Sequence, residues 1–253
     1  MEPLFGLDPL IWNIFTTFLV LVYIMSIIKF MDILVSKGFP QDISRKIIHI
    51  AAGSWVIFWP IYYGEHWSYV LNIAVAFMWT VLFLVKGFTA KPDDPAVKTM
   101  TRTGDPKELL KGPLFFTLVM NTLGIFFFMQ YAAVITMAIL GWGDGLAPVF
   151  GKYYGKHKYR LLGNEKSIEG SLGMFIFSII GALILTFIVR PFGMPSDVVS
   201  LLINIVLISV IATIVEALSP ADVDNLLIPF VTMICYYTFS LFSNPIFPFY
   251  NPF

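Results

Sequence analysis

The segment Gly143–Gly173, GDGLAPVFGKYYGKHKYRLLGNEKSIEGSLG, places charge and glycine between two apolar runs of the sequence. It contains five Lys and Arg residues and seven glycines, and Asp144 stands at its start. A carboxylate at the edge of a membrane is costly unless it is paired. The segment therefore predicts a polar site at a membrane surface.

The composition of the whole chain agrees with this prediction. The 253 residues are 58% hydrophobic and 13% charged, with a mean hydropathy of +0.81. Soluble domains are about one quarter charged, so the chain is expected to be an integral membrane protein. The formal net charge of zero gives no indication of a nucleic-acid partner. The single cysteine, Cys235, excludes an intrachain disulfide.

The hydropathy pattern predicts an all-α, polytopic membrane protein that forms a single transmembrane domain, 1–253. Spanning segments are expected to be helical because lipid offers no partners for backbone N–H and C=O groups. A span needs about 20 mostly apolar residues. The eight candidate spans are 10–29, 46–63, 67–85, 112–129, 131–150, 171–190, 198–217 and 226–243.

The cations are distributed unevenly among the connections between these spans. Three alternate connections, with their flanks, hold 15 of the 16 Lys and Arg residues, and Arg190 is the exception. The positive-inside rule predicts that these connections are cytoplasmic. With eight spans, both termini would lie outside. The polar site is therefore predicted at the cytoplasmic face.

Two of the basic connections contain candidate site residues. In SRKIIHI, 44–50, Arg45 and His49 are four residues apart and would share a helix face with Lys46. A basic membrane flank explains Arg45 and Lys46 equally well, whereas His49 lies a turn further toward the membrane. In the second connection, Asp105 is expected to cap a short helix that follows Arg102.

The third connection, within the opening segment, suggests phosphate chemistry. Gly143, Ala147, Gly151 and Gly155 recur every four residues, which favours close helix packing and also close approach of backbone N–H groups to a phosphate. Asp144 is suited to bind Mg²⁺, which takes one or two carboxylates plus substrate phosphates. Several cations follow. A helix is expected to begin near Ser167, and a helix N-terminus favours an anion.

The acidic connection 218–225 could complete such a site. Glu216 precedes it, and Asp222, Asp224 and Asn225 lie within it. One interpretation is that Asp222 or Asp224 caps the last span. The other is that these carboxylates bind metal with Asp144 or supply a base. Three basic connections and one acidic connection at the same face are typical of a metal–polyphosphate site.

These motifs resemble the polyprenol kinase family, which comprises phytol kinases, dolichol kinases and CTP-dependent diacylglycerol kinases. The resemblance rests on Arg45-Lys46-x-x-His49, on Gly143-Asp144-x-x-Ala147-x-x-x-Gly151-x-x-x-Gly155, on Lys166-Ser167-x-Glu169-Gly170-Ser171, and on Glu216 with Asp224-Asn225-Leu226. Thr101-Arg102-x-Gly104-Asp105, followed by Glu108 and Lys111-Gly112-Pro113, is most similar to the phytol kinase branch and its prokaryotic relatives.

The resemblance implies transfer of the terminal phosphate of a nucleoside triphosphate, typically CTP, to a lipid alcohol such as phytol, geranylgeraniol or farnesol. It implies that Asp144, with Asp224 or Glu216, holds Mg²⁺, that Lys166 neutralises the phosphoryl group, and that His49 or a carboxylate accepts the hydroxyl proton. The expected nucleotide-binding residues are Arg45, Lys46, Arg102, Gly143, Gly151, Gly155, Lys156, Lys166, Ser167, Glu169, Gly170 and Asn225.

Other functions remain open at this point. Membrane cytidylyltransferases such as CDP-diacylglycerol synthase share the Asp-x-x-Ala-x-x-x-Gly-x-x-x-Gly run and the Lys166-x-x-Glu169-Gly170 segment. A CTP-dependent diacylglycerol kinase is a further alternative. A lipid transporter would place polar groups near the bilayer midplane, and the predicted spans place few there. The sequence also leaves a homodimer open.

Overall fold

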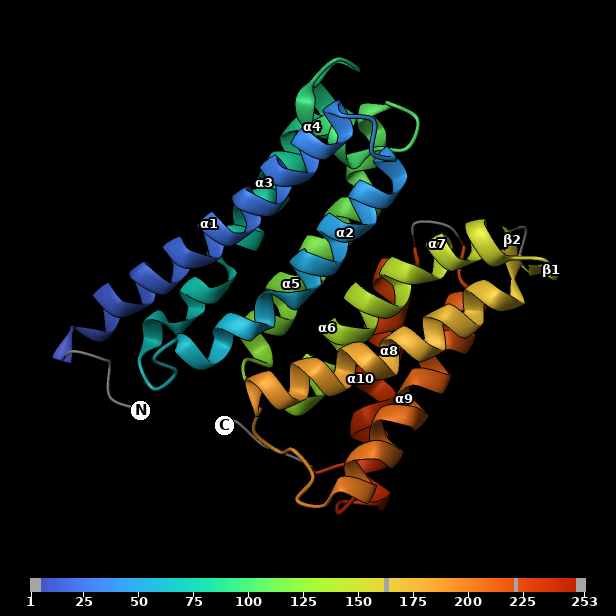
Figure 1. Ribbon diagram of the computed structural model, residues 1–253. Helices are drawn as coiled ribbons and strands as arrows, with labels where there is room; N and C mark the ends of the chain where they lie inside the picture. Colours follow the sequence, from blue (N-terminus) through green and yellow to red (C-terminus); the bar gives the residue numbers. More distant parts are fainter. Residues whose placement is uncertain (1–5, 162–163, 221–222, 249–253) are drawn as a thin grey trace. The chain divides into compact units, whose positions relative to one another are not determined.

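A computed structural model describes residues 6–161, 164–220 and 223–248 (Figure 1). It is 78% helical, which confirms the predicted all-α, polytopic class. The chain divides into two units, Met1–Phe128 and Met129–Phe253, and the single transmembrane domain stays a prediction. Each unit is described by itself.

Within the described part of the chain, seven helical segments are long and apolar enough to cross a membrane. They are Pro9–Ser36, Trp67–Thr89, Pro106–Phe126, Tyr131–Tyr154, Ile168–Val189, Val198–Leu218 and Asp224–Phe242. The predicted span 46–63 is largely helical but is not among these seven. Lys46 and His49 reduce its hydropathy, and Pro60 lies in its 3₁₀ part. The count of eight spans stays a prediction.

The first unit consists of helices joined by short connections. A proline begins α1, and the Asp8 carboxylate accepts a hydrogen bond from the Leu10 N–H at 2.8 Å, which caps this helix. The elements are α1 (Pro9–Ser36), α2 (Gln41–Gly53), η2 (Ser54–Ile61), η3 (Trp67–Ile73), α3 (Ala74–Thr89), α4 (Pro95–Met100), η4 (Pro106–Leu110) and α5 (Gly112–Phe126).

A buried amide attaches the η2–η3 connection to α1. Asn13 is 0% exposed, and its Nδ2 donates to Tyr63 O at 3.2 Å and to Ser68 Oγ at 2.8 Å. Its Oδ1 accepts from the Tyr63 N–H at 2.7 Å. A buried amide is tolerated when its hydrogen bonds are made, so Asn13 fixes this connection against the start of α1.

Two carboxylates organise the connection that carries Arg102. Asp105 caps η4, as predicted, by accepting from the Lys107 N–H at 2.9 Å. The Glu108 carboxylate accepts hydrogen bonds from the backbone N–H groups of Arg102 and Thr103. Glu108 therefore holds the backbone at Arg102 in place.

An ion pair joins α3 to α4. Lys86 Nζ lies 2.7 Å from Asp94 Oδ1, and Asp94 also caps α4 by accepting from the Ala96 N–H at 2.8 Å. The hydrogen bond from Lys86 lowers the pKa of Asp94 below its usual value. The pair therefore stabilises the fold while Asp94 is ionised.

The second unit contains the opening segment of the sequence. Helix α8 packs along α6, η5, α7 and α9, and α10 packs against α9 and α6 (Figure 1). Strands β1 and β2 form an antiparallel hairpin that the sequence did not predict. The elements are α6 (Tyr131–Ala138), η5 (Ile139–Gly143), α7 (Asp144–Tyr154), β1 (Lys158–Leu161), β2 (Asn164–Ser167), α8 (Ile168–Val189), α9 (Val198–Leu218) and α10 (Asp224–Phe242).

We predict that Asn13→Ala destabilises the first unit. The substitution removes the amide that contacts the Tyr63 backbone and the Ser68 hydroxyl, and a buried polar group left without a partner costs about 1–3 kcal/mol. Thermal unfolding in detergent should show a clearly lower Tm. Thr122→Ala, at an exposed position on α5, is the control. Equal Tm values for the two variants would contradict the role of Asn13.

We predict that Lys86→Met lowers the Tm slightly at neutral pH and has less effect in acid. Asp94 has a depressed pKa when folded, so its contribution is present above the unfolded pKa of about 3.9 and is lost as pH falls through the folded value. The Tm difference between variant and wild type should be constant above about pH 5 and should shrink below pH ~4. A difference independent of pH would disprove this assignment.

Candidate active site

Glycines allow the segment 139–155 to lie against α8 at close range. A Cβ on Gly143 would lie 2.1 Å from Ser178 Oγ and 3.1 Å from the Met174 backbone oxygen. A Cβ on Gly151 would lie 3.6 Å from the Cα of Gly170. Helices approach this closely where small residues face each other. The packing interpretation of the glycine stripe therefore holds for these positions, and their phosphate role stays a prediction.

The helical segment that contains Asp144 ends at Tyr154, four residues beyond the predicted span 131–150. Asp144 follows the π-helical turn Ile139–Gly143 and is 4% exposed. The helix continues for ten residues to Tyr154, about 15 Å at 1.5 Å per residue. A carboxylate with so little exposure needs a cation or hydrogen-bond donors, and π turns are frequent at functional sites.

Ser167 begins α8, as predicted. Its Oγ accepts a hydrogen bond from the Gly170 N–H at 3.1 Å, and the residue is 3% exposed. Ideal Cβ positions on Gly151, Gly155 and Gly170 would lie 3.1, 2.6 and 3.1 Å from this Oγ. The three glycines therefore leave room for the capping hydroxyl.

The β1–β2 hairpin precedes this cap. Tyr159 pairs with Lys166 in its register. At its base, His157 Nδ1 lies 2.7 Å from Glu169 Oε1, so Glu169, predicted to bind nucleotide, contacts His157.

Two of the cations in this segment are engaged locally. Arg160 Nη2 lies 3.0 Å from Glu165 Oε2, and Lys158 Nζ donates to Gly151 O at 3.2 Å. Lys156 is exposed beyond the end of α7. Arg160 therefore pairs within the hairpin, and Lys158 contacts the backbone of α7.

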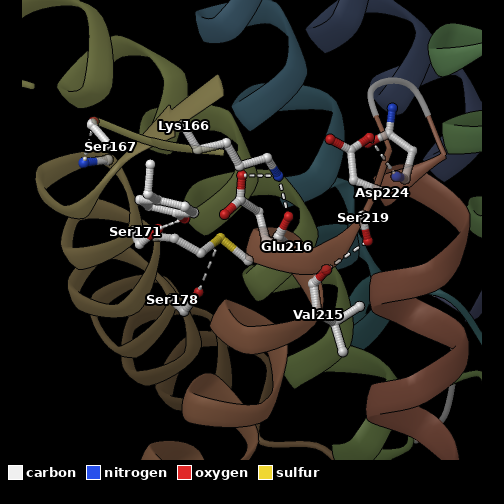
Figure 2. A network of polar contacts seen from close by, with 12 residues as sticks. Lys166, Ser167, Ser171, Ser178, Val215, Glu216, Ser219 and Asp224 are labelled. Atoms are coloured by element: carbon white, nitrogen blue, oxygen red, sulfur yellow. Dashed lines mark hydrogen bonds and ion pairs between the residues drawn. The ribbon is translucent and has the colours of Figure 1, made fainter. Parts of the chain in front are cut away.

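Lys166 and Glu216 form a largely buried ion pair (Figure 2). Lys166 Nζ lies 2.7 Å from Glu216 Oε1, and the two side chains are 17% and 10% exposed. The same ammonium donates to the backbone oxygen of Glu216. The pair joins β2 to the end of α9, where the last carbonyls of a helix lack intrahelical partners.

Asp224 and Asn225 follow at the start of α10. Figure 2 shows Glu216, Ser219 and Asp224 along the connection from α9 to α10. Asn225 is 9% exposed, and its backbone N–H donates to Asp224 Oδ1 at 2.9 Å. Val223 occupies the N-cap position and makes no side-chain cap. Asp222, the other predicted cap, lies outside the described residues.

The predicted metal ligands Asp144, Glu216 and Asp224 can be tested by donor chemistry. Among the described residues, no group of three or more His, Cys, Asp or Glu side chains is placed to hold a metal ion. Mg²⁺ needs one or two carboxylates when substrate phosphates supply the rest. Asp144 and Asp224 provide suitable oxygens, whereas Glu216 faces the ammonium of Lys166.

The other predicted site residues belong to the first unit. Arg45, Lys46 and His49 lie on α2, which confirms the predicted helix, and all three are partly exposed. The His49 ring packs against Phe116 of α5 with centroids 4.3 Å apart. Arg102 is exposed after α4. The position of these residues relative to Asp144 and Lys166 remains a prediction.

The sequence missed two contacts of the second unit. Lys166 and Glu216 are 50 residues apart, and no spacing rule connects residues on different elements at that separation. The His157–Glu169 contact spans 12 residues and depends on the unpredicted hairpin. A short run rich in charge, 158–167, is the available signal for that hairpin, and charge alone does not distinguish a hairpin from a loop.

The fold and the ion pair of the second unit thus indicate a helical membrane protein with a charged site. Comparison with known proteins shows the family. The chain is 30% identical over 241 residues to the probable phytol kinase 1, chloroplastic, of Glycine max, covering 92% of this chain and 80% of that protein. It is 31% identical over 202 residues to the phytol kinase 1, chloroplastic, of Arabidopsis thaliana, covering 78% and 66%. No family model and no solved structure matches.

A third relative is the farnesol kinase, chloroplastic, of Arabidopsis thaliana, which is 29% identical over 190 residues, covering 74% of this chain and 62% of that protein. The chain belongs to the polyprenol kinase family. This membership confirms the resemblance that the sequence motifs carry.

We predict that Gly143→Ala destabilises the second unit by about 1–3 kcal/mol, the usual cost of overpacking. The new methyl group would overlap Ser178 Oγ, so Ser178→Gly in the same chain should restore part of the loss. Thermal unfolding of both single variants and the double variant measures this. A Gly143→Ala protein as stable as wild type would contradict the packing.

Proposed function

We propose that the protein is a membrane lipid kinase that transfers the terminal phosphate of a nucleoside triphosphate, with CTP as donor, to the hydroxyl of an isoprenoid alcohol. The observation that carries the proposal is the similarity over 92% of the chain to a protein named as a phytol kinase. The relative named as a farnesol kinase supports isoprenoid alcohols as the substrate class. Phytol, farnesol and geranylgeraniol are the expected acceptors.

The described residues supply the groups that this chemistry needs. Phosphoryl transfer depends chiefly on positioning and on neutralising charge on the phosphates. Lys166 supplies a fixed ammonium. The N-terminus of the 22-residue helix α8 follows directly, and helix N-termini favour anions. Asp144 and Asp224 would hold Mg²⁺, which when bound offsets phosphate charge.

The alcohol and its activation are assigned from the membrane context. The isoprenoid tail lies among the spanning helices, and the hydroxyl lies at the cytoplasmic interface where the basic connections are proposed to face. We propose that His49 or a carboxylate accepts the hydroxyl proton, and that Arg45, Lys46 and Arg102 contribute positive charge to nucleotide binding. In this topology both termini lie outside.

A panel assay tests the donor and the acceptor together. The protein in lipid nanodiscs is supplied with phytol, geranylgeraniol, farnesol or diacylglycerol and with CTP, ATP or UTP. The expected result is an isoprenoid monophosphate formed fastest with CTP. Preference for diacylglycerol would instead support a diacylglycerol kinase, and binding of lipid without any product would support a transporter.

Isotope position separates the kinase from a cytidylyltransferase, which the shared Lys166-x-x-Glu169-Gly170 segment keeps as the second candidate. A kinase labels the lipid from γ-labelled CTP. A cytidylyltransferase labels it from α-labelled CTP. Lipid labelled from the α position alone would overturn the proposal.

We predict that Asp144→Asn lowers kcat by about 10²–10³-fold. An amide would hold Mg²⁺ less firmly than the carboxylate does, so the charge on the phosphates would be offset less well. The protein should remain folded, with a Tm close to wild type. Asp197→Asn is the matched control, since Asp197 caps the opposite end of α9 from Glu216. Near-normal turnover of the Asp144 variant would remove this carboxylate from the site.

A further inference from the structure

We infer that Glu216 is the positioning residue for Lys166 and is not a metal ligand. The inference rests on the proposed function, because it takes the Lys166 ammonium to be a phosphate contact. It goes further by assigning Glu216 a role through another side chain. The contacts of the pair carry the inference.

Among the described residues, the two acceptors of the ammonium come from one residue. Lys166 Nζ contacts Glu216 Oε1 at 2.7 Å and also donates to the Glu216 backbone oxygen. A lysine ammonium has three N–H donors. Two are therefore directed at Glu216, and the third remains for a phosphate oxygen. A flexible side chain is thus held in one orientation by a carboxylate and a carbonyl.

Both ends of the pair are attached to ordered structure. On one side, Lys166 lies in β2 next to Ser167, whose hydroxyl caps α8. On the other, the Glu216 backbone oxygen also accepts from the Ser219 N–H at 3.2 Å, and α9 packs along α8. The ammonium is therefore ordered by elements on both sides, which reduces the entropy lost when a substrate binds.

Burial explains why the partner is a carboxylate. A largely buried ammonium is costly without a counter-charge, and removing one member of a buried pair leaves the other uncompensated. The carboxylate of Glu216 offsets the charge of the ammonium. Oε1 of Glu216 contacts the ammonium. This contact makes the carboxylate a poor ligand for Mg²⁺, because the ammonium would repel a second cation beside it.

This arrangement predicts opposite effects on binding and on turnover. In Glu216→Gln the negative charge is lost, so nucleotide binds tighter, by about 3–10-fold. The ammonium is held less firmly, and kcat falls by about 10–100-fold, as expected for a small misplacement of a reacting group. Glu216→Asp keeps the charge at a shorter reach and should lie between Glu216→Gln and wild type in kcat.

A double-mutant cycle with Lys166→Met isolates the contact. Because Glu216 acts on turnover through Lys166, Glu216→Gln should not lower kcat further once Lys166→Met is present, whereas the gain in nucleotide affinity from the lost negative charge should persist. Affinity is measured by binding of a non-hydrolysable CTP analogue, which needs no turnover. The double variant leaves no unpaired buried charge, so it remains testable where Lys166→Met alone folds poorly. Tm and size-exclusion profiles check folding of each protein.

Three results would overturn the inference. An equal fall in kcat for Glu216→Gln with and without Lys166 would show independent roles. A raised Mg²⁺ requirement would identify Glu216 as a metal ligand. A lowered Tm with unchanged affinity and kcat per folded molecule would leave a purely structural pair. Wild-type protein that binds the analogue and phosphorylates no alcohol would disprove the proposed function, whereas the Mg²⁺ dependence of analogue binding by Glu216→Gln would still decide whether Glu216 is a metal ligand.

Discussion

The second unit depends on the rule that charge buried in a membrane protein must be compensated. Lys166 and Glu216 satisfy it with each other at 2.7 Å, and their contact ties β2 to the end of α9. Without that tie the hairpin would be anchored at its base by the more exposed contact between His157 and Glu169. Lys166 and Glu216 therefore stabilise the fold of this unit as well as supplying charged groups.

Close helix packing depends on a second constraint, the absence of Cβ atoms between α8 and the segment 139–155. The glycines near Ser167 Oγ leave space for the hydroxyl that caps α8. The same glycines therefore set both the helix–helix distance and the N-terminus of the helix that follows Lys166. Packing and the proposed phosphate site cannot be separated at these positions, because a methyl group would disturb both.

The sequence predicted what depends on local properties. Hydropathy located the helices, and Ser167 and Asp105 were identified as caps because a capping oxygen acts within three residues. It gave no signal where distant residues decide. The contact between Lys166 and Glu216 joins residues 50 apart, and the assignment of Glu216 to metal stays a prediction. The π turn before Asp144 has no residue signature of its own, and Lys46 and His49 left 46–63 ambiguous between a span and a polar helix.

The ion pair limits what Lys166 can contribute under the proposed function. Its ammonium is already offset by the carboxylate of Glu216, so the pair adds little net positive charge toward a nucleoside triphosphate. Mg²⁺ held by Asp144 and Asp224 would supply positive charge when bound. The fixed ammonium would then serve to orient one phosphate oxygen, and neutralisation of the triphosphate would fall chiefly to the metal ion.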